Sequence, residues 1–238
     1  MAIDRLDLDI LDSEILGVIG PNGAGKTTLF NLLCGVHFPT SGRIVFSGED
    51  ITGLEAHEAA QRGIGRTFQA NILFMQSTVI DNVITGFHVN YRAAPWKVLF
   101  HSRAAKEEDR IARQRALETL EFMGLSSAKD ELAHKLPYGF QRILGVCLAL
   151  ATNPKLLLLD EPLAGMNPVE TDTMMHVIRG IRDKGITIAL VEHNLKATMT
   201  LCDRITVLNY GRKIAEGLPA EIRMNKDVIK AYFGKEQI

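Results

Sequence analysis

The stretch GPNGAGKTT, residues 20–28, decides the fold. An apolar run that ends in glycine, ILGVIG at 15–20, precedes it and is typical of a buried parallel strand. The apolar stretch from about Lys26 to Cys34 that follows is predicted to be a helix. This placement is what the phosphate-loop pattern G-x-x-x-x-G-K-[ST] requires, and the pattern positions are Gly20, Gly25, Lys26 and Thr27.

The chemistry of the loop suits a nucleotide with several phosphates. Glycines let backbone N–H groups wrap the phosphates, and the helix N-terminus adds a dipole that favours an anion. Lys26 is predicted to reach the β- and γ-phosphates, and Thr27 to offer its hydroxyl to Mg²⁺. We expect the whole loop to contact the nucleotide: Gly20, Pro21, Asn22, Gly23, Ala24, Gly25, Lys26, Thr27 and Thr28.

Two acidic residues end a second apolar run, KLLLLDEP at 155–162. Ligands of open α/β sheets bind beyond the carboxyl ends of the strands, so we expect this pair near the phosphates. Asp160 is placed to hold Mg²⁺, directly or through water, and Glu161 to orient or deprotonate an attacking water. The plainer alternative is that Asp160 only ends the strand; the phosphate loop in the same chain favours the metal site.

The composition is that of a globular protein of 238 residues, with 46% hydrophobic and 23% charged residues. A formal net charge of -1 gives no global field for nucleic acid, which we do not expect as a partner. No apolar run reaches the 18 residues that would indicate a membrane-spanning helix. The cysteines at 34, 147 and 202 lie far apart in apolar contexts, so we expect small core residues and no disulfide or zinc site.

Strands that alternate with helices predict a parallel sheet covered on both faces. The fold class expected is α/β, with a P-loop NTPase three-layer core, a small antiparallel β part and an inserted helical subdomain. We expect one domain whose core is 1–69 and 153–217, whose helical subdomain is about 70–152, and whose helical tail is 218–238.

Local patterns predict the individual elements of this domain. Alternation of Leu6, Leu8 and Ile10 with charged residues predicts a half-buried first strand. Thr78 with Asp81 predicts a helix start. The remaining predicted elements are strands at 43–50, 63–69, 155–160 and 186–193, a hairpin at 204–217, a helix at 104–123 that Gly124 ends, and a helix that begins at Asn167-Pro168.

Six short elements of the chain resemble, in order, those of ATP-binding-cassette (ABC) ATPases. They are GPNGAGKTT, Gln69 in RTFQ, LPYGFQR at 136–142, LLLLDEP, AGMN at 164–167 and His193 in VEHN. Within the family the chain is most similar to the ATPases of bacterial branched-chain amino acid importers. That similarity rests on RTFQANILFMQSTVIDNV, the Tyr-Gly pair of the signature, EPLAGMNPVET and the tail DVIKAYFG.

The resemblance implies ATP and Mg²⁺ as cofactors and adds two site residues. Gln69 would contact Mg²⁺ or the γ-phosphate at the hinge to the helical subdomain; otherwise it is a polar residue at a strand end. His193 would contact the γ-phosphate; otherwise it is a core histidine. In the family, two chains sandwich two ATP molecules, each held by one chain's phosphate loop and the other's signature. The expected signature contacts are Pro137, Tyr138, Gly139, Phe140 and Gln141.

The chain departs from the family pattern at three places. Pro137 replaces a serine of the signature, so a hydroxyl and an N–H are lost, and Phe140 replaces a glutamine. Asn167 stands where many members have Asp, and we expect it chiefly to cap the following helix. No aromatic residue precedes Phe30, so the residue that stacks on adenine in the family is missing. Either the start is displaced or a partner residue supplies the stack.

The resemblance implies a peripheral ATPase subunit at the cytoplasmic face of the cell membrane. It would energise uptake of branched-chain amino acids or a related small polar solute. Its expected partners are a second ABC ATPase in a homo- or heterodimer, two transmembrane permease subunits, and indirectly an extracytoplasmic solute-binding protein. We expect residues around 70–90, including Phe74 and Met75, to dock the permease; the alternative is that these side chains, with Trp96, Leu99 and Phe100, form the core of the insert.

Two other kinds of protein carry the same motifs: a soluble non-transport ABC ATPase and a nucleotide-binding partner subunit with weak hydrolysis. A soluble non-transport ABC ATPase, of the kind found in DNA repair or translation, usually carries a coiled-coil insert or two cassettes, and this chain has neither. Its basic residues at 103–115 alternate with acidic ones, as on a solvated helix face. The second alternative is a nucleotide-binding partner subunit with weak hydrolysis, against which Glu161 argues.

Overall fold

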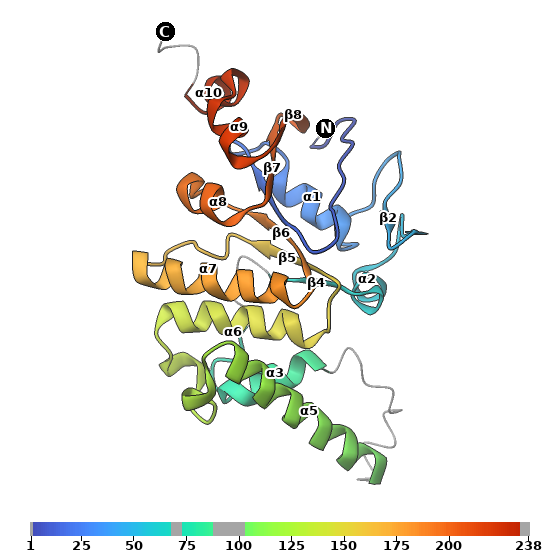
Figure 1. The fold of residues 1–238 in the computed structure, drawn as a ribbon. Coiled ribbons are helices and arrows are strands. Elements are labelled where there is room, and N and C mark those ends of the chain that lie inside the picture. The colour runs from blue at the N-terminus through green and yellow to red at the C-terminus, as the bar shows by residue number, and fades with distance from the viewer. Residues whose placement is uncertain (1, 68–72, 88–102, 234–238) are drawn as a thin grey trace.

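The computed structural model describes residues 2–67, 73–87 and 103–233. Within these residues, one six-stranded sheet forms the centre of the molecule (Figure 1). Its strands lie in the order β4 (Ile64–Arg66), β5 (Leu156–Asp160), β6 (Thr187–Val191), β1 (Ile15–Ile19), β7 (Arg204–Asn209) and β8 (Arg212–Gly217). All neighbours are parallel except β7 and β8, which form the hairpin predicted at 204–217.

Helices cover both faces of this sheet, so the predicted α/β fold class is confirmed. One face carries α1 (Lys26–Leu33) and α2 (Ala56–Arg62), next to a small hairpin of β2 (Val45–Phe46) and β3 (Glu49–Asp50). The helices on the other face are α6 (Tyr138–Ala151), α7 (Pro168–Asp183), α8 (Leu195–Leu201) and α9 (Pro219–Met224), and α10 (Lys226–Phe233) contacts β8.

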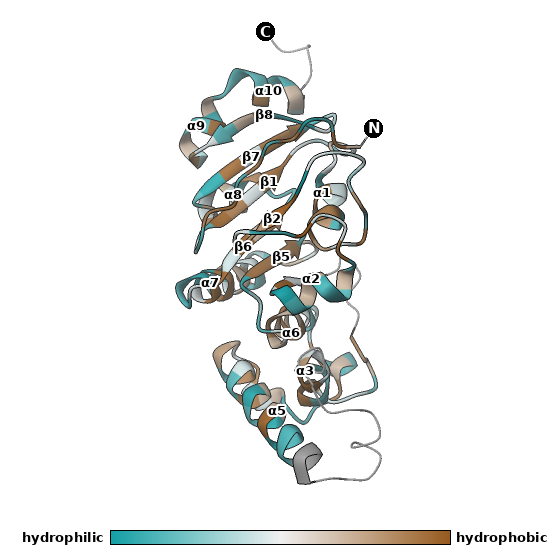
Figure 2. Cartoon of the chain, turned by 90° about the vertical axis from the view of Figure 1, so that its right-hand side faces the viewer, coloured by the Kyte–Doolittle hydropathy of each residue, from teal (hydrophilic) through white to brown (hydrophobic). Residues whose placement is uncertain are grey.

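Two hydrophobic cores result from the alternation of side chains along the strands. On β5, Leu157 and Leu159 pack with the helices α6 to α9, whereas Leu156 and Leu158 pack with α1. Because both faces are covered, the central strands β1, β5 and β6 are buried along their whole length and are mostly apolar, as the hydropathy colouring shows (Figure 2). This explains why KLLLLD predicted a buried strand so clearly.

The described part of residues 70–152 is helical. It contains α3 (Val79–Phe87), α5 (Arg103–Phe122) and α6, with two short 3₁₀ turns, η2 (Ser126–Ala128) and η3 (Ala133–Lys135). The backbone N–H of Asp81 donates to the hydroxyl of Thr78 over 3.2 Å, so the predicted helix start is confirmed. Four apolar residues of the predicted 104–123 helix, three or four positions apart, are buried: Ala112, Ala116, Leu120 and Met123. Gln69, Trp96, Leu99 and Phe100 lie outside the described residues.

The N-terminal segment is not the strand that its alternation predicted. Residues 2–14 contain no strand, although Leu6, Leu8 and Ile10 do turn inward and pack against the core shared with α1. The alternation therefore predicted the buried side chains correctly and the backbone pairing wrongly. The physical reason is position: the segment covers a face of the sheet, whereas a ladder needs the N–H and C=O groups of a sheet edge.

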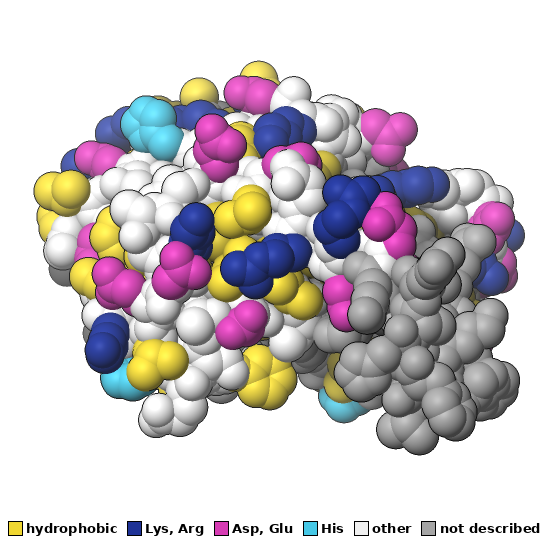
Figure 3. Space-filling view, turned by 90° about the horizontal axis from the view of Figure 1, so that it is seen from below, with side chains coloured by type: hydrophobic (Ala, Val, Ile, Leu, Met, Phe, Trp, Pro, Cys, Tyr) yellow, Lys and Arg dark blue, Asp and Glu magenta, His cyan; other side chains and the backbone are white. Residues whose placement is uncertain are grey.

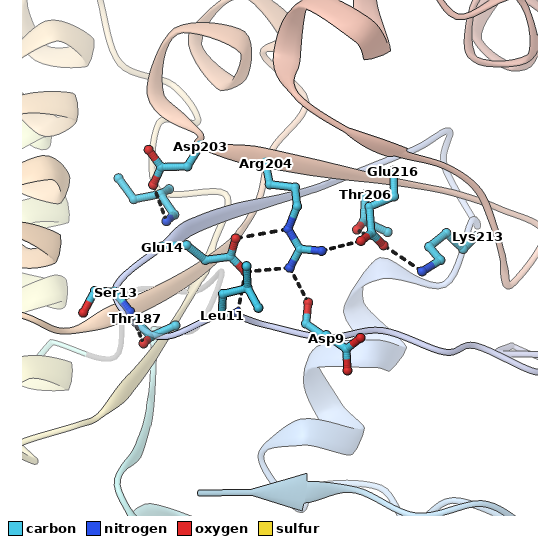
Figure 4. A network of polar contacts seen from close by, with 11 residues as sticks. Asp9, Leu11, Ser13, Glu14, Thr187, Asp203, Arg204, Thr206, Lys213 and Glu216 are labelled. Carbon is cyan, nitrogen blue, oxygen red and sulfur yellow. Dashed lines mark hydrogen bonds and ion pairs between the residues drawn. The ribbon is translucent and has the colours of Figure 1, made fainter.

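Arg204, at the start of β7, fastens this segment to the sheet (Figure 4). Its guanidinium donates to both oxygens of Glu14, over 2.7 and 3.1 Å, and to the carbonyl of Asp9 over 2.6 Å. It also pairs with Glu216 on β8. Because a buried carboxylate such as Glu14 is costly unless paired, the network satisfies that charge and ties residues 9–14 to β7 and β8.

Candidate functional site

The phosphate loop joins β1 to α1 as predicted. Lys26 is 6% exposed, and its ammonium donates to the carbonyls of Gly20, over 2.7 Å, and Pro21, over 3.1 Å. Burial lowers the pKa of Lys26, and the nearby carboxylates of Glu161 and Asp160 act against that shift. The lysine is therefore held inside its own loop, close to both predicted acids.

Gly25 caps α1 in a conformation that only glycine adopts easily. Its φ is 104°, and a Cβ there would lie 2.6 Å from the carbonyl oxygen of Ala2. Gly211, in the β7–β8 turn, donates its N–H to the carbonyl of Ala24 over 2.9 Å. The loop is thus supported from outside by the N-terminal segment and by the hairpin turn.

Both acids lie where the sequence places them, at the carboxyl end of β5. Asp160 is 3% exposed and its Oδ2 lies 3.0 Å from a guanidinium nitrogen of Arg66, at the end of β4. Glu161 has a φ of 49°, a left-handed conformation that is uncommon for a residue with a side chain and is typical of functional sites. Its Oε1 lies 3.0 Å from Nε2 of His193, which follows β6. The structure therefore brings Lys26, Asp160, Glu161 and His193 together.

Glu192 is a site residue that the sequence reasoning missed. It is 2% exposed, and its carboxylate accepts the backbone N–H groups of Leu163, over 2.7 Å, and His193, over 3.1 Å. Burial raises the pKa of Glu192, and these N–H groups act against that shift. Glu192 thereby joins the loop after Glu161 to the chain at His193. The available signal was an acid directly after the apolar run ITIALV.

The signature segment 137–141 forms the start of α6, with Pro137 as its N-cap. The Tyr138 hydroxyl donates to the carbonyl of Ala164 over 3.1 Å, and the Gly139 N–H donates to Oε1 of Glu170 over 3.2 Å. Phe140 is 41% exposed. The segment is therefore packed against the loop 164–167 and the first turn of α7, while Phe140 faces outward.

Glu170 serves two helix starts at once. Asn167 is the N-cap of α7, and its side chain accepts the N–H of Glu170 over 3.0 Å, which confirms the predicted cap. The second oxygen of Glu170 accepts the N–H of Asn167 over 3.0 Å. A Cβ on Gly139 would lie 2.7 Å from Oε1 of Glu170, so this close approach explains the glycine.

Comparisons with known proteins agree with this geometry. The family model "ABC transporter" matches residues 3–164, and the model "Branched-chain amino acid ATP-binding cassette transporter" matches residues 212–237. Over 236 residues the chain is 39% identical to the high-affinity branched-chain amino acid transport ATP-binding protein BraF of Pseudomonas aeruginosa, which covers 99% of this chain and 92% of BraF.

Solved structures give the same picture. The ADP conformation of MJ1267, an ATP-binding cassette of an ABC transporter, matches with a TM-score of 0.85 and 31% identity, over 98% of this chain and 93% of that one. A dimeric post-hydrolysis structure of the cassette MJ0796, bound to ADP and Pi, matches with a TM-score of 0.76 and 25% identity, over 92% of this chain and 90% of that one.

The contact between Gly139 and Glu170 predicts a non-additive pair of substitutions. Gly139→Ala should destabilise the fold by about 1–3 kcal/mol, because the new Cβ overlaps the Glu170 side chain. In Gly139→Ala/Glu170→Ala the overlap is gone, so the double variant should be more stable than the sum of the single losses predicts. Denaturant unfolding of the four proteins measures this, and strict additivity would contradict it.

The buried carboxylate of Glu192 predicts a pH-dependent stability. Since its pKa is raised in the fold, the folded state holds the proton more tightly than the unfolded chain. The stability from this group is present below the unfolded value near 4.5 and is lost as pH rises through the folded pKa. Glu192→Gln should therefore lie further below the wild type in Tm at pH 4.5 than at pH 7. Glu121→Gln, on the exposed face of α5, is the control, and an equal gap at both pH values would contradict the prediction.

Proposed function

The chain belongs to the ABC transporter family of ATP-binding proteins and is an ATPase, and we propose that it energises the uptake of branched-chain amino acids or a related small polar solute. The observation that carries the proposal is the cluster of Lys26, Asp160, Glu161 and His193 at the carboxyl ends of β1, β5 and β6. The match of residues 212–237 to the branched-chain amino acid model supports the class of solute.

The phosphate loop supplies binding and positive charge. Residues 20–28 wrap the phosphates with backbone N–H groups, and Lys26 swings from its own carbonyls to the β- and γ-phosphates. The ammonium is an ionised donor in both arrangements, and the phosphate oxygens add an opposite charge that the carbonyls lack, which strengthens the contact. Phosphoryl transfer to water needs positioning and charge neutralisation more than covalent chemistry, so this step carries much of the catalysis.

The donor set of the site fits Mg²⁺, which prefers hard oxygen ligands. Asp160 offers a carboxylate, and Thr27 offers a hydroxyl from the exposed first turn of α1. Both acids act against the lowering of the Lys26 pKa by burial, so they lie within electrostatic reach of the phosphate-binding lysine. A bound ion would neutralise phosphate charge; Gln69 stays the third predicted ligand.

Glu161 and His193 handle the attacking water. Glu161 accepts the proton of the water, or holds it in line, as a general base next to the γ-phosphate. The imidazole of His193, with Nε2 3.0 Å from the carboxylate, fixes the direction of that carboxylate. Its predicted contact with the γ-phosphate belongs to the same proposal. Glu192 keeps the two loops that carry these residues at a constant separation.

A second cassette completes the site in this proposal. The start of α6, with Pro137, Tyr138, Gly139, Phe140 and Gln141, would face the ATP of the partner, through a helix N-terminus suited to an anion. The dimer of the related cassette MJ0796 supports a two-cassette arrangement. The partner would be an identical chain or a second, similar ATPase.

In this proposal, the conformational change that ATP binding and hydrolysis produce in the cassettes is transmitted to two permease subunits at the cytoplasmic face of the membrane. A solute-binding protein would lie on the outer side. No helix among the described residues is both long and apolar enough to cross a bilayer. Phe74 and Met75, just before α3, are 53% and 39% exposed. Exposed apolar side chains at the helical subdomain favour a docking surface over an internal core.

The charges on the face of the molecule at the α3–α5 end help to distinguish a transporter subunit from a soluble ABC ATPase that acts on nucleic acid. Basic and acidic side chains are interspersed over its described part (Figure 3), and Arg110 pairs with Glu107 on α5. Nucleic acid would favour a surface of one sign, because phosphate contacts dominate its binding. The mixed surface therefore supports the transporter proposal.

Glu161→Gln tests hydrolysis directly. The variant should keep ATP binding and lose roughly 10²–10⁴-fold in steady-state ATPase rate, because the amide cannot accept the proton of the attacking water. Radiolabelled or coupled-assay turnover gives the rate, and binding of a fluorescent ATP analogue gives the control. Equal rates in wild type and variant would sink the proposal that the chain hydrolyses ATP with Glu161, and would favour a nucleotide-binding partner subunit.

Cross-linking from position 74 or 75 tests the permease surface. Phe74→Cys and Met75→Cys should capture a permease subunit in membranes that contain the transporter, because both side chains are exposed. The native cysteines are buried and should stay silent. Phe38 is 58% exposed and lies after α1, so Phe38→Cys is the matched control. Capture from Phe38→Cys alone would move the docking surface elsewhere.

A further inference from the structure

Arg66 forms a buried ion pair with the carboxylate that the proposed function gives to Mg²⁺. Its side chain is 7% exposed and that of Asp160 is 3% exposed, and Nη2 lies 3.0 Å from Oδ2. The two residues come from neighbouring parallel strands, β4 and β5, which end at the same edge of the sheet. A guanidinium nitrogen of Arg66 thus takes one oxygen of Asp160, Oδ2.

The same guanidinium is anchored to the helix that follows the phosphate loop. Nη1 donates to Oδ1 of Asn31 over 2.6 Å and lies 3.2 Å from Sγ of Cys34. The guanidinium carbon lies 5.9 Å from the ring centre of Phe30. Because the fork of Arg is planar and rigid, contacts at both ends fix the direction in which it meets Asp160, which a flexible Lys could not do.

We infer that Arg66 is a positioning residue for Mg²⁺, which sets the orientation of Asp160 and leaves it to meet the ion through Oδ1. The inference rests on the proposed function of Asp160. The residue after Arg66 also contacts Asp160. The Thr67 hydroxyl accepts the backbone N–H of Asp160 over 3.2 Å. Arg66 and Thr67 are therefore joined to Asp160 at two points, its carboxylate and its backbone N–H.

Two other roles for Arg66 make different predictions. If its charge mainly weakened the metal by neutralising Asp160, removing that charge would tighten metal binding. If it served only as packing, the metal would be indifferent to it in any variant that folds. Positioning predicts weaker metal binding after its loss, since a carboxylate released from its partner no longer presents one oxygen in a set direction.

Metal binding measured apart from turnover tests the inference. Mn²⁺ titration of the ADP-loaded protein, followed by electron paramagnetic resonance, should show an affinity lower by roughly 10–100-fold in Arg66→Met. Affinity for a fluorescent ATP analogue in EDTA should equal that of the wild type, because the phosphates are held by residues 20–28. Arg62→Met, which removes an exposed arginine at the end of α2 that pairs with Glu49, should change neither value.

Asn31→Ala keeps both charges and removes one anchor of the guanidinium. It should shift Mn²⁺ affinity in the same direction as Arg66→Met, by less, and it carries the test if Arg66→Met fails to fold. Unchanged or tighter Mn²⁺ binding in the folded variants would overturn the inference. A wild type whose nucleotide complex shows no specific Mn²⁺ binding would instead overturn the proposed role of Asp160, and the inference with it.

Discussion

Charges that are removed from water must be compensated, and this constraint shapes the whole site. Taking one ion out of water costs several kcal/mol unless partners replace the water. Lys26, Asp160 and Glu192 are all less than a tenth exposed, and each has a different partner. The carbonyls of the phosphate loop satisfy Lys26, the guanidinium of Arg66 satisfies Asp160, and backbone N–H groups satisfy Glu192. The ends of β4, β5 and β6 must therefore stay in register, because the partners of Asp160 and Glu192 each join two of these strand ends.

Most of the fold could be predicted from the sequence, because its main elements follow from local patterns. A parallel sheet covered on both faces requires apolar runs without alternation, and ILGVI, LLLLD and TIALV are such runs. Phosphate binding requires glycines and a lysine at fixed spacing, so GPNGAGKTT is visible without any structure. Helix starts depend on contacts within a few residues, which is why Thr78 and Asn167 were recognised as caps. Local rules suffice wherever the physical contact is also local.

Contacts between distant segments could not be predicted in this way. Arg66 and Asp160 lie 94 positions apart, and nothing in GRTFQ alone indicates a partner for the arginine. Glu192 directly precedes His193, which the sequence reasoning chose as the site residue. The carboxylate of Glu192 accepts the N–H of Leu163, and the sequence around Glu192 does not reveal that distant partner. At the N-terminus the alternation of Leu6, Leu8 and Ile10 fixes which side chains are buried, but an edge strand and a covering segment share that pattern.

The signature segment shows how the two kinds of contact meet. Its sequence, with proline in place of serine, lacks a hydroxyl and an N–H that could face an anion. In the fold, the N–H of Gly139 already has a carboxylate partner, Glu170, whose second oxygen holds the turn at Asn167. An anion that takes this N–H has to displace or share the Glu170 carboxylate, because a backbone N–H has a single hydrogen to donate. The proposed phosphate recognition at the start of α6 would therefore be coupled to the position of the Asn167 turn through Glu170, which lies 31 positions from the glycine.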